Sequence, residues 1–242
     1  MKNIDKNETL NNADIACDLC RKKYSYEEIL DILSSGTVIE KQPAILALEE
    51  LKSSEDCEKL LHNLIGQDGR IREVTAFKVN ELIEKYPQFF QSPKSLETLL
   101  KSVIDVNPTI CRLIIDALKF VDDKAAIVKK LIDELKILAY ELSLLPKNAG
   151  KYVLNKKYFK LYWLLEALSE VCLCSQTIFE KDSIIELTKI LDDCSEYTIR
   201  EKLHKLCSIA ANLGCDEFAE FVKLFQNDEN FYVRRNILSD NA

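Results

Sequence analysis

Turn-forming residues are scarce in this sequence. The 242-residue chain has only five glycines and five prolines. Tight hairpin turns depend on these residues, so a protein built of many hairpins would need more of them. Leu, Lys and Glu, which favour helices, are abundant instead. No stretch of useful length alternates polar and apolar residues as a strand does. The composition therefore predicts an all-α protein.

Positive charge is also in deficit. The chain has 33 Lys and Arg against 40 Asp and Glu, which gives a net charge of −7. Nucleic acids and anionic membranes attract clustered positive charge, so this balance argues against a broad surface for either. It leaves room for a local basic patch. No apolar run is long enough to span a bilayer, so we expect no contact with a membrane.

A secretory signal is not visible either. The first twelve residues are polar and lack an apolar core, and the nine cysteines are odd in number and scattered. We therefore expect a cytoplasmic protein. In that reducing compartment the thiols would pack as small apolar side chains.

Motifs that carry known chemistry are missing. The two glycine-rich phosphate motifs and the calcium-binding loop are absent. Cys17 and Cys20 form a C-x-x-C pair, but no second pair completes a four-ligand zinc site. Cys207 follows His204 by three residues, but a catalytic pair also needs an orienting acid and an oxyanion hole. We predict no catalytic residue, no metal site and no cofactor.

Amphipathic helices joined by short turns follow one another along most of the chain. Capping and breaking residues predict where several of them begin or end. The signals are capping boxes at Ser25–Glu28 and Ser183–Glu186, Ser92 before Pro93 at a helix start, Pro43 near a helix start, and Gly214 just after a helix end.

The stretch 143–150 is the one part dense in helix-breaking residues, and it predicts a division of the chain. We expect an N-terminal leader and capping helix at 1–22, helical repeats at 23–142, a loop or hinge at 143–150, and further repeats at 151–242.

The second helix of each pair has a recurring form, in which a basic residue follows an apolar or aromatic one near the start. Taken as equivalents, Arg72, Arg112, Lys160, Arg200 and Arg234 recur at intervals of 34 to 48 residues. Helix pairs that recur with such a period are typical of an α-solenoid, in which each pair buries its apolar face against the next.

An acidic or amide residue in the preceding turn accompanies these basic residues. The pairs are Asp68 with Arg72, Asp193 with Arg200, Asp228 with Arg234 and, as a looser match, Asn107 with Arg112. With them, residues 25 to 238 resemble the HEAT-repeat family and its armadillo relatives. The resemblance implies a right-handed α-solenoid of about five to six helix pairs. It also implies that turn acids and second-helix arginines of successive repeats form a ladder between layers.

The basic and aromatic cluster at 150–168 is the most distinctive local composition. One interpretation is a binding patch for an acidic peptide or a nucleic-acid strand. The other is that the aromatic side chains are core residues and the lysines form a solvated face. The candidate contact residues are Lys156, Lys157, Tyr158, Lys160, Tyr162 and Trp163.

Together these features favour a non-catalytic scaffold or adaptor that binds a partner protein along the concave surface of the second helices. Two alternatives stay open. One is an enzyme on a HEAT-like scaffold, similar to alkylpurine DNA glycosylases or bilin lyases. The other is a structural subunit of a larger complex.

Overall fold

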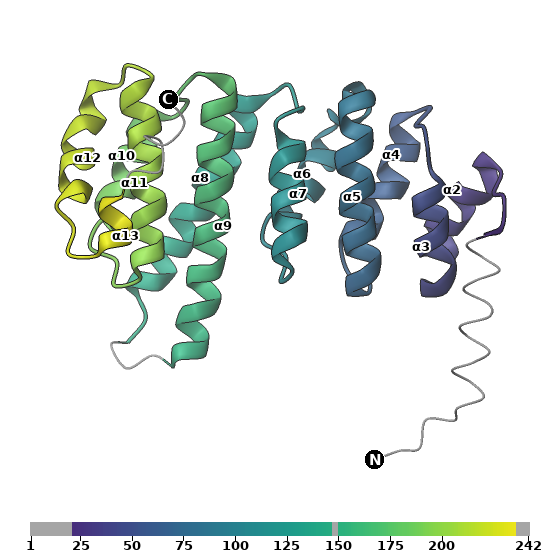
Figure 1. The fold of residues 1–242 in the computed structure, drawn as a ribbon, viewed down its shortest axis with the longest axis horizontal. Coiled ribbons are helices and arrows are strands. Elements are labelled where there is room, and N and C mark those ends of the chain that lie inside the picture. The colour runs from purple at the N-terminus through teal and green to yellow at the C-terminus, as the bar shows by residue number, and fades with distance from the viewer. Residues whose placement is uncertain (1–20, 147–149, 236–242) are drawn as a thin grey trace, which may run out of the picture. The chain divides into compact units, whose positions relative to one another are not determined.

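The computed structural model describes residues 21–146 and 150–235, and their regular structure is entirely helical (Figure 1). No strand occurs in these ranges, which confirms the prediction of an all-α protein. None of the helices in them combines the length and the apolar character of a membrane span. The predicted leader and the Cys17–Cys20 pair lie outside the described residues.

The contacts divide the chain into two compact units, and the boundary between them in the sequence lies between Phe120 and Val121. The division predicted from the breaker residues at 143–150 does not coincide with this boundary. Those residues connect α8 (Lys124–Ser143) to α9 (Lys151–Ser175), and the two helices pack against each other within the second unit. A segment dense in helix breakers ends a helix, but tertiary contacts decide whether it also separates two units.

The first unit consists of three successive helix pairs. In each pair the first helix packs on the second, and α5 contacts both α3 and α7 while α4 contacts both α2 and α6. The unit therefore has a row of first helices and a row of second helices with an apolar core between them. The helices are α2 (Tyr26–Ser35), α3 (Val38–Ala47), α4 (Ser54–Leu61), α5 (Gly69–Lys85), α6 (Pro93–Ser102) and α7 (Pro108–Leu118), with 3₁₀ turns at His62–Leu64 and Pro87–Phe90.

The second unit follows the same order. Its second helices are in series, because α11 contacts α9 on one side and α13 on the other, and α10 contacts α8 in the row of first helices. After α8 and α9 come α10 (Lys181–Leu191), α11 (Tyr197–Asn212), a 3₁₀ turn at Asp216–Phe218, α12 (Ala219–Gln226) and the short α13 (Phe231–Arg234).

Most of the predicted helix signals are confirmed. Ser25 and Glu28 form the expected capping box, Ser92 caps α6 at Pro93, and Gly214 follows the end of α11 with a φ of 85°. The prediction of a capping box at Ser183–Glu186 is wrong. Helix α10 begins two residues earlier, at Lys181, so Ser183 lies inside it.

The start of α3 also differs from the prediction. Thr37 and Glu40 form a capping box that the sequence analysis missed, and the helix begins at Val38. Pro43 consequently lies inside the helix and not near its start. The Thr-x-x-Glu spacing was the available signal for this earlier beginning.

Candidate interaction surface

Arg72 connects α5 to the turn before α7. Its Nε and Nη2 donate to the two carboxylate oxygens of Asp105 at 2.7 and 3.2 Å, and its Nη1 donates to the carbonyl oxygen of Gln67 at 2.6 Å. The Asp105 carboxylate also accepts from the backbone amide of Asn107, the N-cap residue of α7, at 2.8 Å. One carboxylate therefore joins two successive second helices.

Arg200 makes the same set of contacts in the second unit. Its Nε and Nη2 donate to the Asp228 carboxylate at 2.7 and 3.0 Å, and its Nη1 donates to the carbonyl oxygen of Cys194. Asp228 in turn accepts from the backbone amide of Asn230, the N-cap residue of α13, at 2.7 Å. The chain thus repeats one interhelical contact, which we call the arginine clamp, at Arg72–Asp105 and Arg200–Asp228.

Both clamps are largely shielded from solvent. The side chains of Arg200 and Asp228 are each 10% exposed. The hydrogen bond to Asp228 raises the pKa of Arg200, and the same bond lowers the pKa of the Asp228 carboxyl. The hydrogen bond to Asp105 likewise raises the pKa of Arg72. Bidentate pairing in such surroundings orients the turn as well as stabilising it.

The residues predicted to form a ladder differ in the contacts that they make. Arg72, Arg200 and Asp228 belong to the clamps, whereas Asp105 was missed by the sequence analysis. Asp68 caps α5 by accepting from the amide of Arg70, and Arg234 donates to the carbonyl oxygens of Asp228 and Glu229. Arg112 and Asp193 are exposed.

A repeated Asp-x-Asn spacing was the available signal for Asp105. Residues 105–107 read Asp-Val-Asn, and residues 228–230 read Asp-Glu-Asn. In both turns the Asp accepts from the Asn amide and the Asn caps the next helix. The acid that receives the arginine therefore comes from the turn before the next second helix, not from the turn before the arginine's own helix.

A second charged network connects α9 to α11. The Nζ of Lys202 lies 2.9 Å from Oε2 of Glu166, and the Nζ of Lys205 lies 3.0 Å from Oε1 of Glu166 and 2.9 Å from Oε1 of Glu170. Burial raises the pKa of Glu166, but the charges of Lys202 and Lys205 outweigh it, so the net shift is downward. The network holds two neighbouring second helices together.

The predicted aromatic cluster lies mostly within the packing of the second unit. Trp163 is only 6% exposed, and its ring meets those of Phe159 and Tyr162 edge to face. The Tyr162 ring also lies 4.6 Å from the Nζ of Lys202, and the Tyr158 hydroxyl is 3.1 Å from Oγ of Ser195. Trp163 therefore offers almost no surface to a partner or to a nucleic-acid base.

The lysines of the same cluster do reach the surface. Lys156, Lys157 and Lys160 line a groove of about 380 Å³ between α8 and α9. Lys157 is paired with Glu141 of α8 at 2.6 Å. Tyr152 and Val153, which also line the groove, are 80% and 44% exposed.

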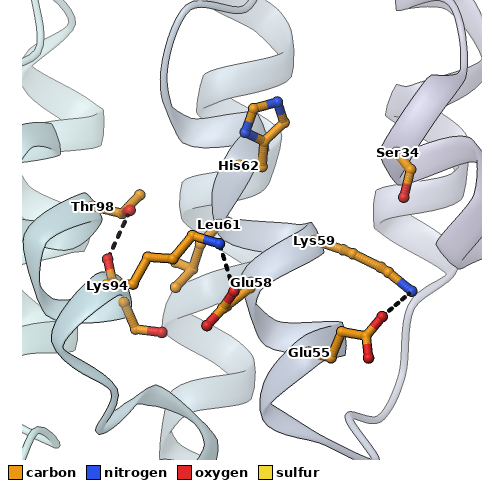
Figure 2. A pocket seen from close by; sticks show the side chains of 9 residues that line it. Ser34, Glu55, Glu58, Lys59, Leu61, His62, Lys94 and Thr98 are labelled. Atoms are coloured by element: carbon orange, nitrogen blue, oxygen red, sulfur yellow. Dashed lines mark hydrogen bonds and ion pairs between the residues drawn. The ribbon is translucent and has the colours of Figure 1, made fainter.

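The first unit has a separate hollow of about 330 Å³ among α2, α4 and α6 (Figure 2). Its lysines are already paired with its glutamates. Lys59 lies 3.2 Å from Glu55 and Lys94 lies 2.6 Å from Glu58, while Thr98 donates to the carbonyl oxygen of Lys94 (Figure 2). This hollow therefore has little net charge with which to attract an ionic ligand.

Most cysteines of the described ranges are buried in the core between the helices. Burial raises the pKa of the Cys57, Cys172 and Cys207 thiols to about 12. The hydrogen-bond contact of Cys207 is with Thr188, whereas Nδ1 of His204 lies 2.5 Å from the carbonyl oxygen of Val233. Within the residues that the structure describes, no group of three or more His, Cys, Asp and Glu is arranged to hold a metal ion.

Comparison with known proteins identifies no family for this chain. No protein-family model matches it, and no curated protein sequence matches it. Among solved structures, the crystal structure of an engineered protein is similar over 90% of this chain and 92% of its own, with 12% identity and a TM-score of 0.37.

Proposed function

We propose that the chain is a HEAT-like α-solenoid that binds a partner protein along the surface of its second helices. The arginine clamp carries this proposal. It occurs once in each unit. In both, the same guanidinium nitrogens donate to both oxygens of an Asp carboxylate, and that carboxylate accepts from the backbone amide of an N-cap asparagine. A contact that recurs between successive second helices supports a repeat array, and repeat arrays present extended binding surfaces.

Exposed apolar side chains on the second helices support a binding role. Phe77 on α5 is 52% exposed, and Phe231 and Tyr232 on α13 are 61% and 58% exposed. The Tyr232 ring centroid lies 5.9 Å from that of Tyr197 at the start of α11 and 5.7 Å from that of Phe231. Clustered exposed aromatic residues are enriched at sites where proteins bind one another.

An affinity experiment tests the binding role. The full chain serves as bait in an extract of its native cells, beside the variants Phe77→Glu and Tyr232→Glu. Ile190→Glu is the matched control, since Ile190 is 45% exposed on the first helix α10. We expect a stoichiometric partner whose recovery falls with either second-helix variant and survives the control. Equal recovery with all variants contradicts a second-helix surface, and recovery of no partner contradicts the scaffold function.

Small-angle scattering tests the solenoid itself. A compact globule of this length would have a radius of gyration of about 18 Å. A solenoid is longer than it is wide, so we expect a larger value and an asymmetric distance distribution. A symmetric distribution near the compact value would contradict the proposed architecture.

A further inference from the structure

We propose that the groove between α8 and α9 binds an acidic segment of a partner protein, an inference that rests on the proposed scaffold function. The two helices lie side by side in the second unit (Figure 1). Leu138 and Glu141 of α8 form one wall of the groove, and Tyr152, Val153 and three lysines of α9 form the other. We call this site the lysine groove.

The charge of the lysine groove is opposite to that of the chain. Three lysines face one glutamate there, whereas the whole chain has a net charge of −7. Lys157 is neutralised by Glu141 at 2.6 Å. Lys156 and Lys160 form no ion pair within 4.0 Å with any residue of 21–146 or 150–235, although the charge of Lys160 adds to the effect of the Lys157 hydrogen bond in lowering the pKa of Glu141. Two cationic side chains are thus available to an anionic partner.

The end of the groove nearest the start of α9 is also positive. Helix α9 has no acidic residue in its first turn, and its N-cap residue Gly150 supplies no side-chain cap. Lys151 is its first residue, so positive charge gathers where the helix dipole is also positive. Carboxylates of a bound segment would reduce the repulsion between these positive charges. Their contacts with the lysines would also stabilise the complex directly.

The spacing of the lysines suits a polypeptide. Lys156 and Lys160 are four residues apart on one helix face, which is a rise of about 6 Å. Acidic side chains two residues apart in an extended segment are separated by about 6.6 Å, so an acid-x-acid segment matches the two lysines. Val153 and the exposed Tyr152 ring on one wall, with Leu138 on the other, offer apolar surface to an apolar side chain of the same segment.

These features favour a peptide over a single nucleic-acid strand. A strand without sequence preference binds through several exposed aromatic faces that stack on its bases. The lysine groove offers one such face, Tyr152, because Trp163 is buried.

Fluorescence anisotropy with the full chain tests the inference. The probe is a labelled twelve-residue peptide in which Glu alternates with Ser and Leu, and its twin carries Gln at every Glu position. We expect the acidic peptide to bind, its affinity to fall on the order of tenfold in Lys156→Glu/Lys160→Glu and at high salt, and the Gln twin not to bind. Lys129→Glu/Lys130→Glu is the matched control, because it changes the net charge equally at two exposed lysines in the first half of α8.

Three outcomes would overturn the lysine groove: no binding of the acidic peptide, an equal loss in the control variant, or tighter binding of a labelled oligothymidylate than of the peptide. Circular dichroism establishes that each variant is folded, and the milder Lys156→Gln/Lys160→Gln variant should give a smaller loss in the same direction. If the native partner is recovered equally by wild type and by Lys156→Glu/Lys160→Glu, the lysine groove fails while the scaffold function stands. If wild type recovers no partner, the scaffold function itself fails.

Discussion

The carboxylate of Asp228 is held at once by the guanidinium of Arg200, at 2.7 and 3.0 Å, and by the backbone amide of Asn230, at 2.7 Å. It thereby attaches the start of α13 to the side of α11. The same geometry at Asp105 attaches the start of α7 to α5. Each clamp is a directional and largely buried contact, so we expect its turn to be sensitive to the loss of either partner.

Removal of the Asp228 charge should destabilise the second unit. In Asp228→Asn the guanidinium of Arg200, which is 10% exposed, keeps its charge and loses its counterion. We expect the free energy of unfolding to fall by about 3 to 5 kcal/mol, as for other buried pairs that lose one partner. Urea unfolding followed by the fluorescence of Trp163, the only tryptophan, measures it. Asp193→Asn, at an exposed acid, is the control and should change stability by less than about 0.5 kcal/mol.

The clamp should also make stability depend on acid pH. The hydrogen bond from Arg200 lowers the pKa of Asp228 in the folded state below that of an unfolded Asp, about 3.9. Its contribution is therefore complete above the unfolded pKa and is lost as the pH falls through the folded pKa. We expect the difference in unfolding free energy between wild type and Asp228→Asn to shrink as the pH is lowered from 5 towards 2.5. A difference that stays constant over this range would show that the carboxylate charge is not what stabilises the turn.

The network around Glu166 should respond differently to single and double changes. Glu166→Gln leaves Lys202, which is 7% exposed, without its counterion, and we expect the free energy of unfolding to fall by about 3 to 5 kcal/mol. Glu166→Leu/Lys202→Met removes both charges and should recover most of that loss, because apolar residues of similar size often replace a buried pair without cost. Urea unfolding measures both variants, with Glu134→Gln on the exposed face of α8 as the control. A double variant as unstable as Glu166→Gln would contradict this interpretation.

Neighbouring thiols should differ sharply in reactivity. Cys172 is buried and its pKa is raised to about 12, whereas Cys174, two residues later on α9, is exposed. The thiolate is the reactive species, so maleimide at neutral pH should modify Cys174 well before Cys172. Peptide mapping by mass spectrometry at short labelling times measures the order, and labelling in urea provides the fully reactive reference. Equal rates for the two thiols in the native protein would contradict the described packing of α9.

Helical content and several helix ends were predictable from the residues alone. The scarcity of Gly and Pro, and short-range signals such as Ser25 with Glu28, act within one turn of helix and need no tertiary partner. The predicted helix start at Ser183 was wrong because a local signal does not by itself decide where a helix begins. Its Ser-x-x-Glu spacing is equally good locally, but the helix starts at Lys181, and nothing in the local pattern excludes the earlier start.

The partners of charged and aromatic side chains were decided by the tertiary structure. The sequence identified Arg72 and Arg200 as residues that recur at helix starts, but the acids that bind them lie 33 and 28 residues further on, so only the packing of successive helices brings them together. Likewise, the sequence located the lysine and aromatic cluster. The packing of α9 against α8 and α11 then buries Trp163 and leaves Lys156 at the surface. Composition and local spacing determine that these segments are helices, because those energies act between near neighbours. Which face is buried, and which charge meets which, depends on contacts between segments distant in the chain.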